Sequence, residues 1–93
     1  MFKRIAAITM ARNDEFFLNR WIAYYGKQIS EENLYIYLDG MDQKIPSGAG
    51  KAHITKLEHK DLPRLKGDKH RIKLLSDLAA NLFSQGYDLV IGT

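Results

Sequence analysis

A chain of 93 residues with 45% hydrophobic and 27% charged residues has the size and composition of one folded domain, which excludes a disordered tail or a collagen-like repeat. The sequence contains no cysteine, so disulfides, thiolate zinc sites and cysteine nucleophiles are excluded, and a reducing cytoplasm is the expected compartment. There is no run of about 18 apolar residues, and the start of the chain lacks the apolar core of a signal peptide, so we expect neither a membrane span nor a secretory leader.

The net charge of +3 is unevenly distributed. Residues 51–73 contain eight basic and three acidic residues and all three histidines, whereas the rest of the chain contains six basic and eight acidic residues. A basic segment in an otherwise near-neutral domain favours an anionic partner such as a phosphate, a nucleic acid or a lipid head group. A solvated, lysine-rich surface is the alternative interpretation.

The first half of the chain predicts a strand, a helix and a second strand. Residues 3–10 form an apolar run with β-branched residues, which is typical of a buried strand. After a turn at residues 11–13, Asn13 is the predicted helix N-cap, and the helix is expected to end at Gly26 or in the polar segment behind it. Helical spacing is shown by Phe17, Leu18, Trp21, Ile22, Tyr24 and Tyr25. Residues 34–38 predict the second strand, which stops at Asp39-Gly40.

The second half predicts a loop, a strand, a long helix and a last strand. Residues 43–51 form the loop, and residues 52–57 alternate between apolar and polar, as in a more exposed strand. The long helix is predicted to start near Asp68 and to reach a C-cap at Gly86. This helix is predicted to be amphipathic, with Ile72, Leu75, Leu78, Ala79, Leu82 and Phe83 on one face. Residues 87–93 predict the fourth strand, with 89–91 read as an interior strand.

This order of elements predicts an α/β fold. Strands that alternate with helices favour right-handed parallel crossovers, so we expect a small, mainly parallel four-stranded sheet with flanking helices, similar to a Rossmann fold. An apolar last strand with nothing after it is unusual, which predicts that residues 1–93 are one domain that corresponds to the front part of a larger fold.

Candidate binding residues follow the strands. Ligands of open parallel sheets bind outside the carboxyl ends of the strands, where residues 9–13, residues 39–42 and Thr93 are expected. A carboxylate such as Asp39 suits a ribose hydroxyl or a base N–H, and the alternative is a turn cap. Arg12 suits a phosphate, and the alternative is a surface arginine. Helix capping alone explains Asn13.

Several catalytic signatures are absent from the sequence. There is no G-x-G-x-x-G after the first strand, no phosphate-binding loop and no G-x-S-x-G, and residues 48–51 are read as a flexible glycine-containing loop. The three histidines lack metal-ligand spacing and are interpreted as surface or interface residues. The aromatic residues of the first helix are attributed mainly to core packing, with a subunit contact through Tyr24 and Tyr25 as the alternative.

The chain resembles the N-terminal half of the family 2-like glycosyltransferases, which have the GT-A fold. The resemblance is carried by residues 8–15, Leu18, Trp21, Tyr24, Tyr25 and residues 34–40, followed by residues 66–69 and 86–93. It covers nearly the whole chain, and it rests on the order and spacing of these segments because no single motif is diagnostic.

The resemblance implies a nucleotide-binding site for a sugar donor, with a UDP-type nucleotide favoured. It implies that Thr9, Ala11, Arg12 and Asn13 lie near the nucleotide, that Asp39 contacts the base or ribose, and that Lys66 and Arg71 contact phosphate. The family's metal-binding Asp-x-Asp is expected just after Thr93, so a divalent metal (Mn or Mg) is expected only in a longer relative. We therefore expect no metal site, no catalytic residue and no transferase turnover in this chain alone.

Two further functions remain as alternatives. The first is a non-catalytic basic module that binds nucleic acid through residues 51–73, which the lack of interleaved aromatic residues there makes the weaker candidate. The second is a role in assembly, because a fourth strand beside the first would leave an open sheet edge. That edge, at residues 87–93, predicts a homodimer.

Overall fold

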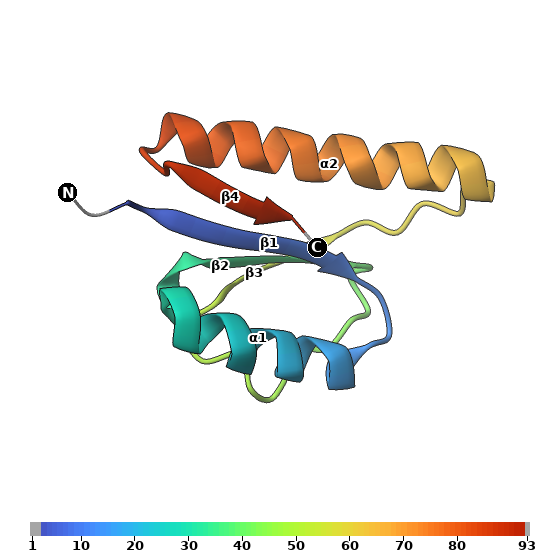
Figure 1. The fold of residues 1–93 in the computed structure, drawn as a ribbon. Coiled ribbons are helices and arrows are strands. Elements are labelled where there is room, and N and C mark those ends of the chain that lie inside the picture. Colours follow the sequence, from blue (N-terminus) through green and yellow to red (C-terminus); the bar gives the residue numbers. More distant parts are fainter. Residues whose placement is uncertain (1–2, 93) are drawn as a thin grey trace.

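The strands of this chain form one parallel sheet, flanked by a helix on each face (Figure 1). The computed structural model describes residues 3–92. The strands are β1 (Ile5–Ala11), β2 (Leu34–Asp39), β3 (His53–Leu57) and β4 (Leu89–Gly92), in the spatial order β3-β2-β1-β4. The predicted α/β fold with a four-stranded, Rossmann-like sheet is confirmed, and the sheet is parallel throughout.

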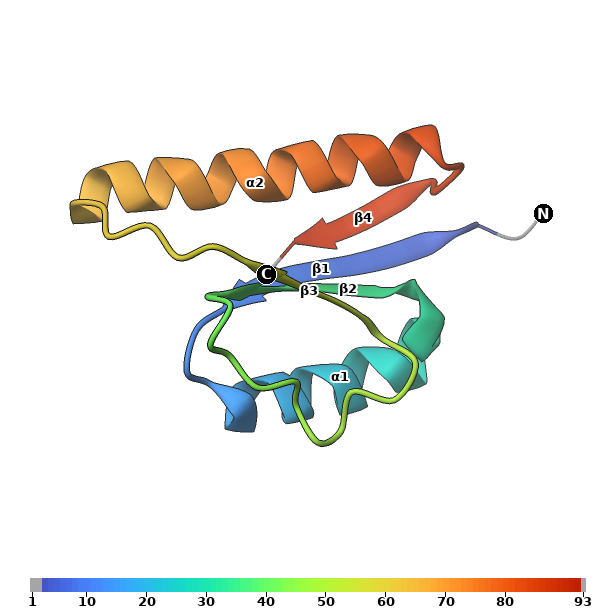
Figure 2. The ribbon, with the colours of Figure 1, turned by 180° about the vertical axis from the view of Figure 1, so that it is seen from behind.

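Helices α1 (Glu15–Ile29) and α2 (Arg64–Ser84) cover opposite faces of the sheet (Figures 1 and 2), and a short 3₁₀ helix, η1 (Glu31–Asn33), precedes β2. Strand β1 lies between β2 and β4, with Ile8 opposite Tyr35 on one side and Gly92 on the other. Because all four strands run the same way, their carboxyl ends share one edge of the sheet, where the sequence predicted the site.

Two apolar clusters hold the helices onto the sheet. The cluster beneath α1 contains Ala7, Ala11, Leu18, Trp21, Ile22, Leu34, Ile36, Leu38 and Ala49. The cluster beneath α2 is smaller and contains Ala6, Ile8, Leu82 and Tyr87. Successive residues of β1 enter opposite clusters because side chains alternate along a strand, which explains why both faces of this strand are apolar.

Helix α1 begins one residue later than predicted. Asn13 was predicted as the N-cap, which is wrong: the side chain of Asp14 caps α1 by accepting a hydrogen bond from the Phe17 amide at 3.2 Å. Asn13 instead has a φ of 54°, in the left-handed region that asparagine tolerates better than most residues. The helix continues through Gly26 to Ile29, because the core contact extends to Ile29.

Helix α2 begins earlier than the prediction near Asp68. Pro63 is its N-cap, and the first turn is closed by the Gly67 amide, which donates to the Pro63 carbonyl at 2.8 Å. Proline has no N–H to leave unpaired, so it suits a helix start. At the other end Gln85 is the C-cap, and Gly86 follows at a φ of 100°, the left-handed conformation that ends many helices.

Two predictions about burial are wrong. The aromatic residues of α1 were attributed mainly to core packing, but Phe16 and Tyr24 are 72% and 61% exposed and Phe17 is also exposed. Only Trp21 is buried, with Tyr25 packed partly against the core, because the sheet covers one side of α1. Residues 89–91 were read as an interior strand, which is wrong among residues 3–92: β4 is an edge strand beside β1, as the assembly alternative expected.

Candidate functional site

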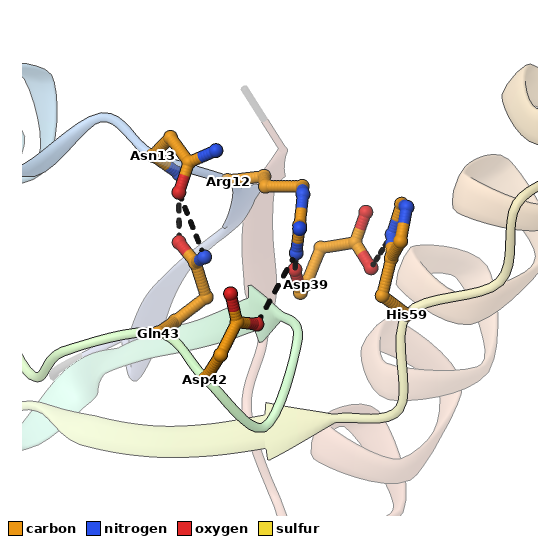
Figure 3. A network of polar contacts seen from close by, with 6 residues as sticks. All are labelled: Arg12, Asn13, Asp39, Asp42, Gln43 and His59. Atoms are coloured by element: carbon orange, nitrogen blue, oxygen red, sulfur yellow. Dashed lines mark hydrogen bonds and ion pairs between the residues drawn. The ribbon is translucent and has the colours of Figure 1, made fainter.

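Arg12 joins the carboxyl ends of β1 and β2. It directly follows β1, and its guanidinium donates a hydrogen bond from Nη1 to the main-chain oxygen of Asp39, the last residue of β2 (Figure 3). The same nitrogen lies 3.5 Å from Oδ1 of Asp42 in the turn after β2. Arg12 therefore orients this turn as well as presenting a positive charge at the sheet edge.

Asn13 and Gln43 hold each other through two hydrogen bonds (Figure 3). The Asn13 amide donates to Gln43 Oε1 at 2.7 Å, and Gln43 Nε2 donates to Asn13 Oδ1 at 2.8 Å. Gln43 is buried, so this pair satisfies polar atoms that would otherwise be costly to remove from water. The pair fixes the loop after β2 against the start of α1.

The carboxylate of Asp39 meets a histidine that the sequence did not single out. His59 Nδ1 lies 3.0 Å from Asp39 Oδ1, and Figure 3 shows the second carboxylate oxygen pointing away from the imidazole. His59 follows β3 by two residues, so the third strand delivers it to the same sheet edge. Arg12 and Asp39 were identified because they lie at the ends of predicted strands. His59 lies just after the predicted third strand, so the same criterion could have identified it.

Asp42 carries a stabilised negative charge. The largest effect on its pKa is a hydrogen bond with its own backbone, which lowers the pKa of this exposed carboxyl below its usual value. Desolvation opposes this lowering, and the Arg12 guanidinium adds to it. Asp42 therefore stays ionised at neutral pH. Neither Asp42 nor Gln43 was assigned a role from sequence, since their contacts depend on how the loop after β2 folds.

A hollow of about 300 Å³ lies between the start of α1 and the loop after β2. It is lined by Asn13, Asp14, Glu15, Leu18, Leu38, Asp42, Gln43 and Lys44. Three of these residues are acidic and one is basic, and Asp14 already occupies the positive end of the helix as its cap. The hollow therefore suits hydrogen-bond donors such as hydroxyl and N–H groups, and it disfavours a phosphate.

The cationic side of the sheet edge lies toward α2. Arg71 of α2 is partly buried and donates from Nη1 to the main-chain oxygen of Met10 at 2.5 Å, near the carboxyl end of β1. Lys66 lies five residues earlier, about 140° around the helix axis, so these two basic residues do not share a helix face. Arg71 thus contacts the end of β1 at Met10, two residues before Arg12. Lys66 is exposed in the first turn of α2.

Two of the predicted nucleotide-binding residues are buried within the sheet. Thr9 lies in the middle of β1 and is 1% exposed, and Ala11 at the end of this strand belongs to the cluster beneath α1. Their side chains contribute to the core, whereas Arg12, Asn13 and Asp39 reach the sheet edge. The predicted binding set therefore divides into core residues and residues at the site.

The basic segment and the exposed aromatic residues lie on different sides of the molecule. Residues 51–73 run through β3 into the first half of α2, whereas Phe16, Phe17 and Tyr24 belong to α1 on the opposite face of the sheet (Figure 2). A surface that binds single-stranded nucleic acid combines cations with aromatic residues in one groove. This separation gives the nucleic-acid alternative no support.

Other possible indicators of function were sought across the described residues. Among residues 3–92, no group of three or more histidine, aspartate or glutamate residues is placed to bind a metal ion, and no helix is long and apolar enough to cross a membrane. Comparisons of the chain with protein-family models, with curated proteins and with solved structures found no significant match.

Proposed function

We propose that this chain binds the nucleotide of a sugar donor at the carboxyl edge of its sheet, as the donor-binding half of a glycosyltransferase-like protein. The observation that carries the proposal is the convergence of Arg12 and Asp39 from the ends of two adjacent parallel strands. Open α/β sheets bind ligands at this edge. The resemblance of residues 8–15 and 34–40 to the family 2-like glycosyltransferases supports the same edge.

The nucleoside part of the ligand belongs beside Asp39 and the acidic hollow. A carboxylate accepts hydrogen bonds and donates none, so it matches a ribose hydroxyl or a base N–H. His59 holds one oxygen of Asp39, which leaves the second oxygen oriented away from the imidazole (Figure 3). The loop held by Asn13 and Gln43 forms a wall of the hollow.

The phosphates belong near two guanidinium groups, that of Arg71 at the end of β1 on the α2 side and that of Arg12, which reaches across to Asp39 and Asp42. The carboxylates of the hollow would repel a diphosphate, whereas these two guanidinium groups attract it. A guanidinium carries five N–H donors, so one bond to a main-chain carbonyl does not preclude a contact with phosphate. Lys66 would reach the ligand only if the diphosphate extended along α2.

The expected activity of this chain is binding without sugar transfer. The 93 residues contain no Asp-x-Asp motif, which in the family holds the metal on the donor diphosphate. Departure of a diphosphate requires that its developing charge be neutralised. Arg12 and Arg71 supply positive charge for binding, and a longer relative would supply the metal.

Titration with UDP, followed by ¹⁵N NMR with and without Mn²⁺, tests the proposal. We expect shifts of the Arg12, Asn13 and Asp39 amides that do not depend on Mn²⁺. Substitution Asp39→Asn should weaken binding about tenfold, because it replaces an ionised acceptor. Asp77→Asn is the matched control, since Asp77 lies on α2 in an exposed ion pair with Lys73.

The absence of shifts at millimolar UDP in the folded protein would overturn the proposed site. Shifts that require Mn²⁺ would contradict the expectation that residues 1–93 hold no metal site. Equal losses of affinity in Asp39→Asn and Asp77→Asn would show that the ligand responds to overall charge and that Asp39 makes no specific contact.

A further inference from the structure

The outer edge of β4 is short, but it carries neither the charge nor the proline that commonly prevents strands from pairing between molecules. Within residues 3–92, β4 pairs with β1 and has no strand on its other side. Its sequence, Leu89-Val90-Ile91-Gly92, contains no charge and no proline. Natural proteins commonly protect edge strands with lysine, proline, bulges or a covering element. Strand β3, at the opposite edge, carries His53 and Lys56.

An uncharged stripe of α2 lies beside this edge. Ile72, Ser76, Ala79 and Phe83 are spaced by four, three and four residues, which places them along one side of the helix. A hollow of about 300 Å³ brings Ile72, Ser76 and Ala79 together with Val90 and Gly92, so the stripe follows β4. Figure 1 shows β4 running alongside the C-terminal half of α2.

The large side chains of this surface are exposed. Ile72 and Phe83 belong to the predicted apolar face of α2, and the structure leaves them 64% and 49% exposed. Leu89 of β4 is 48% exposed. Among residues 3–92 no strand lies beyond β4, so none of the described strands covers the side of α2 that carries Ile72 and Phe83. Exposed apolar side chains grouped along an unpaired edge are typical of an interaction surface.

We propose that two copies of this chain pair through this surface about a two-fold axis, with β4 antiparallel to β4 and α2 antiparallel to α2 of the second copy. The result is a continuous sheet across the dimer. A two-fold contact requires each element to complement itself when read in reverse. Strand β4 and the stripe of α2 both meet this requirement, so we infer that the partner is a second copy of this chain.

The stripe of α2 is self-complementary by size. In the antiparallel arrangement the exposed Ile72 of one copy lies opposite Phe83 of the other, and the small residues Ser76 and Ala79 meet near the axis. Large side chains at both ends and small ones at the centre allow the two helices to approach closely. The strand is equally symmetric, since Val90 would face Val90 of the second copy on the α2 side of the sheet, and Leu89 would face Ile91 on the other side.

No charge opposes this pairing along the stripe. Lys73 and Asp77 follow Ile72 and Ser76 by one residue, so they point about 100° away around the helix. They also neutralise each other, with Nζ and Oδ2 3.0 Å apart. A partner recognised by charge would find no complementary group along the stripe, whereas an identical apolar surface matches it. The interface leaves Arg12 and Asp39 outside the contact, so it does not depend on the proposed nucleotide site.

Sedimentation velocity over a concentration series from about 5 µM to 1 mM tests the dimer. We expect the mass to rise from 10.7 kDa toward twice that value. Ile72→Glu should raise the dissociation constant at least tenfold, because two buried carboxylates would replace apolar contacts. Ile45→Glu is the matched control, since Ile45 is 56% exposed in the loop after β2, and it should leave the association unchanged.

Hydrogen exchange separates strand pairing from contact through α2 alone. In the dimer we expect slower exchange of β4 amides at high than at low protein concentration, and no such dependence in β3. A monomer at every concentration overturns the proposal. A dimer that survives Ile72→Glu also overturns it, and this is the result expected of a dimer formed by exchange of β4. Association without concentration-dependent protection of the β4 amides overturns it as well.

Discussion

The two edges of the sheet are built differently. On the β3 side, residues 43–52 wrap around α1, and hydrogen bonds fasten this loop to the helix: the Ser47 amide donates to Glu15 at 2.9 Å and the Gly48 amide to Asn19 at 2.8 Å. On the β4 side, a four-residue strand is covered by α2 on one face only (Figure 1). The loop on the β3 side is fastened to α1, and the β4 side presents apolar residues to solvent.

The β2 half of the sheet contributes most to stability, whereas the β4 half carries the exposed apolar surface. The side chains buried most completely around α1 and β2 include Ile22, Leu34, Ile36 and Leu38, whereas Leu82 is the one buried residue of α2. Burial of apolar area provides most of the free energy of folding, so the β2 half of the sheet is expected to anchor the fold. The loop contacts of that half also position Arg12 and Asp39. The β4 half, which buries less, retains the apolar surface that a second copy can cover.

Truncation of a β2 core residue tests the comparison with the largest expected effect. Ile36→Ala should lower the free energy of unfolding by about 2–5 kcal/mol, because it leaves a cavity in the cluster beneath α1. Leu89→Ala should cost less than about 1 kcal/mol in the monomer, since Leu89 is half exposed. Urea denaturation at low protein concentration measures both. Equal losses would mean that the two halves of the sheet contribute alike.

Two glycines give a second test at the ends of β2 and β4. Gly40 has a φ of 136°, and a Cβ there would lie 2.4 Å from both Arg12 Nη1 and Asp42 Oδ1. Gly40→Ala should therefore cost about 1–3 kcal/mol through backbone strain and displace Arg12. Gly92→Ala is the control, because a Cβ there meets nothing within 4 Å, and it should change stability by less than about 0.5 kcal/mol. Thermal denaturation of both variants measures the stability, and NMR of Arg12 Nε reports the displacement of Arg12. A Gly40→Ala protein as stable as Gly92→Ala would contradict the expected strain at Gly40.

The smallest expected effect concerns the pH dependence of a tyrosine beneath α2. Burial and a hydrogen bond with Tyr87, whose hydroxyl lies 3.0 Å away, raise the pKa of Tyr35 to about 12. Since this pKa lies above the model-compound value of 10.0, the contribution of Tyr35 to stability is complete below pH 10 and is lost as the pH rises toward 12. Tyr87→Phe should lower the pKa of Tyr35 toward 10, as measured by ¹³C NMR of the ring. An unchanged pKa in this variant would mean that burial alone causes the shift.

The residues at the strand ends show how far sequence reasoning reaches into the site. Arg12 and Asp39 were predicted because a parallel sheet brings its carboxyl ends to one edge, and the structure joins them there. His59 and Gln43 were missed, because their contacts depend on the path of two loops whose sequences fix no single conformation. Thr9 was placed near the ligand from the resemblance, yet it is buried in the core. Proximity along the chain does not specify which atoms face solvent.

The sequence by itself determined the type and order of the elements, the parallel sheet and the edge that carries the candidate site. These follow from hydrophobic periodicity and from the handedness of crossover connections, which act over short stretches of chain. The tertiary structure decided what lies opposite each face. Periodicity placed Ile72 and Phe83 on an apolar side of α2, but whether that side meets a strand or solvent depends on where the sheet ends. A side chain is buried only where a second surface covers it, and the pattern of a helix describes only the helix's own surface.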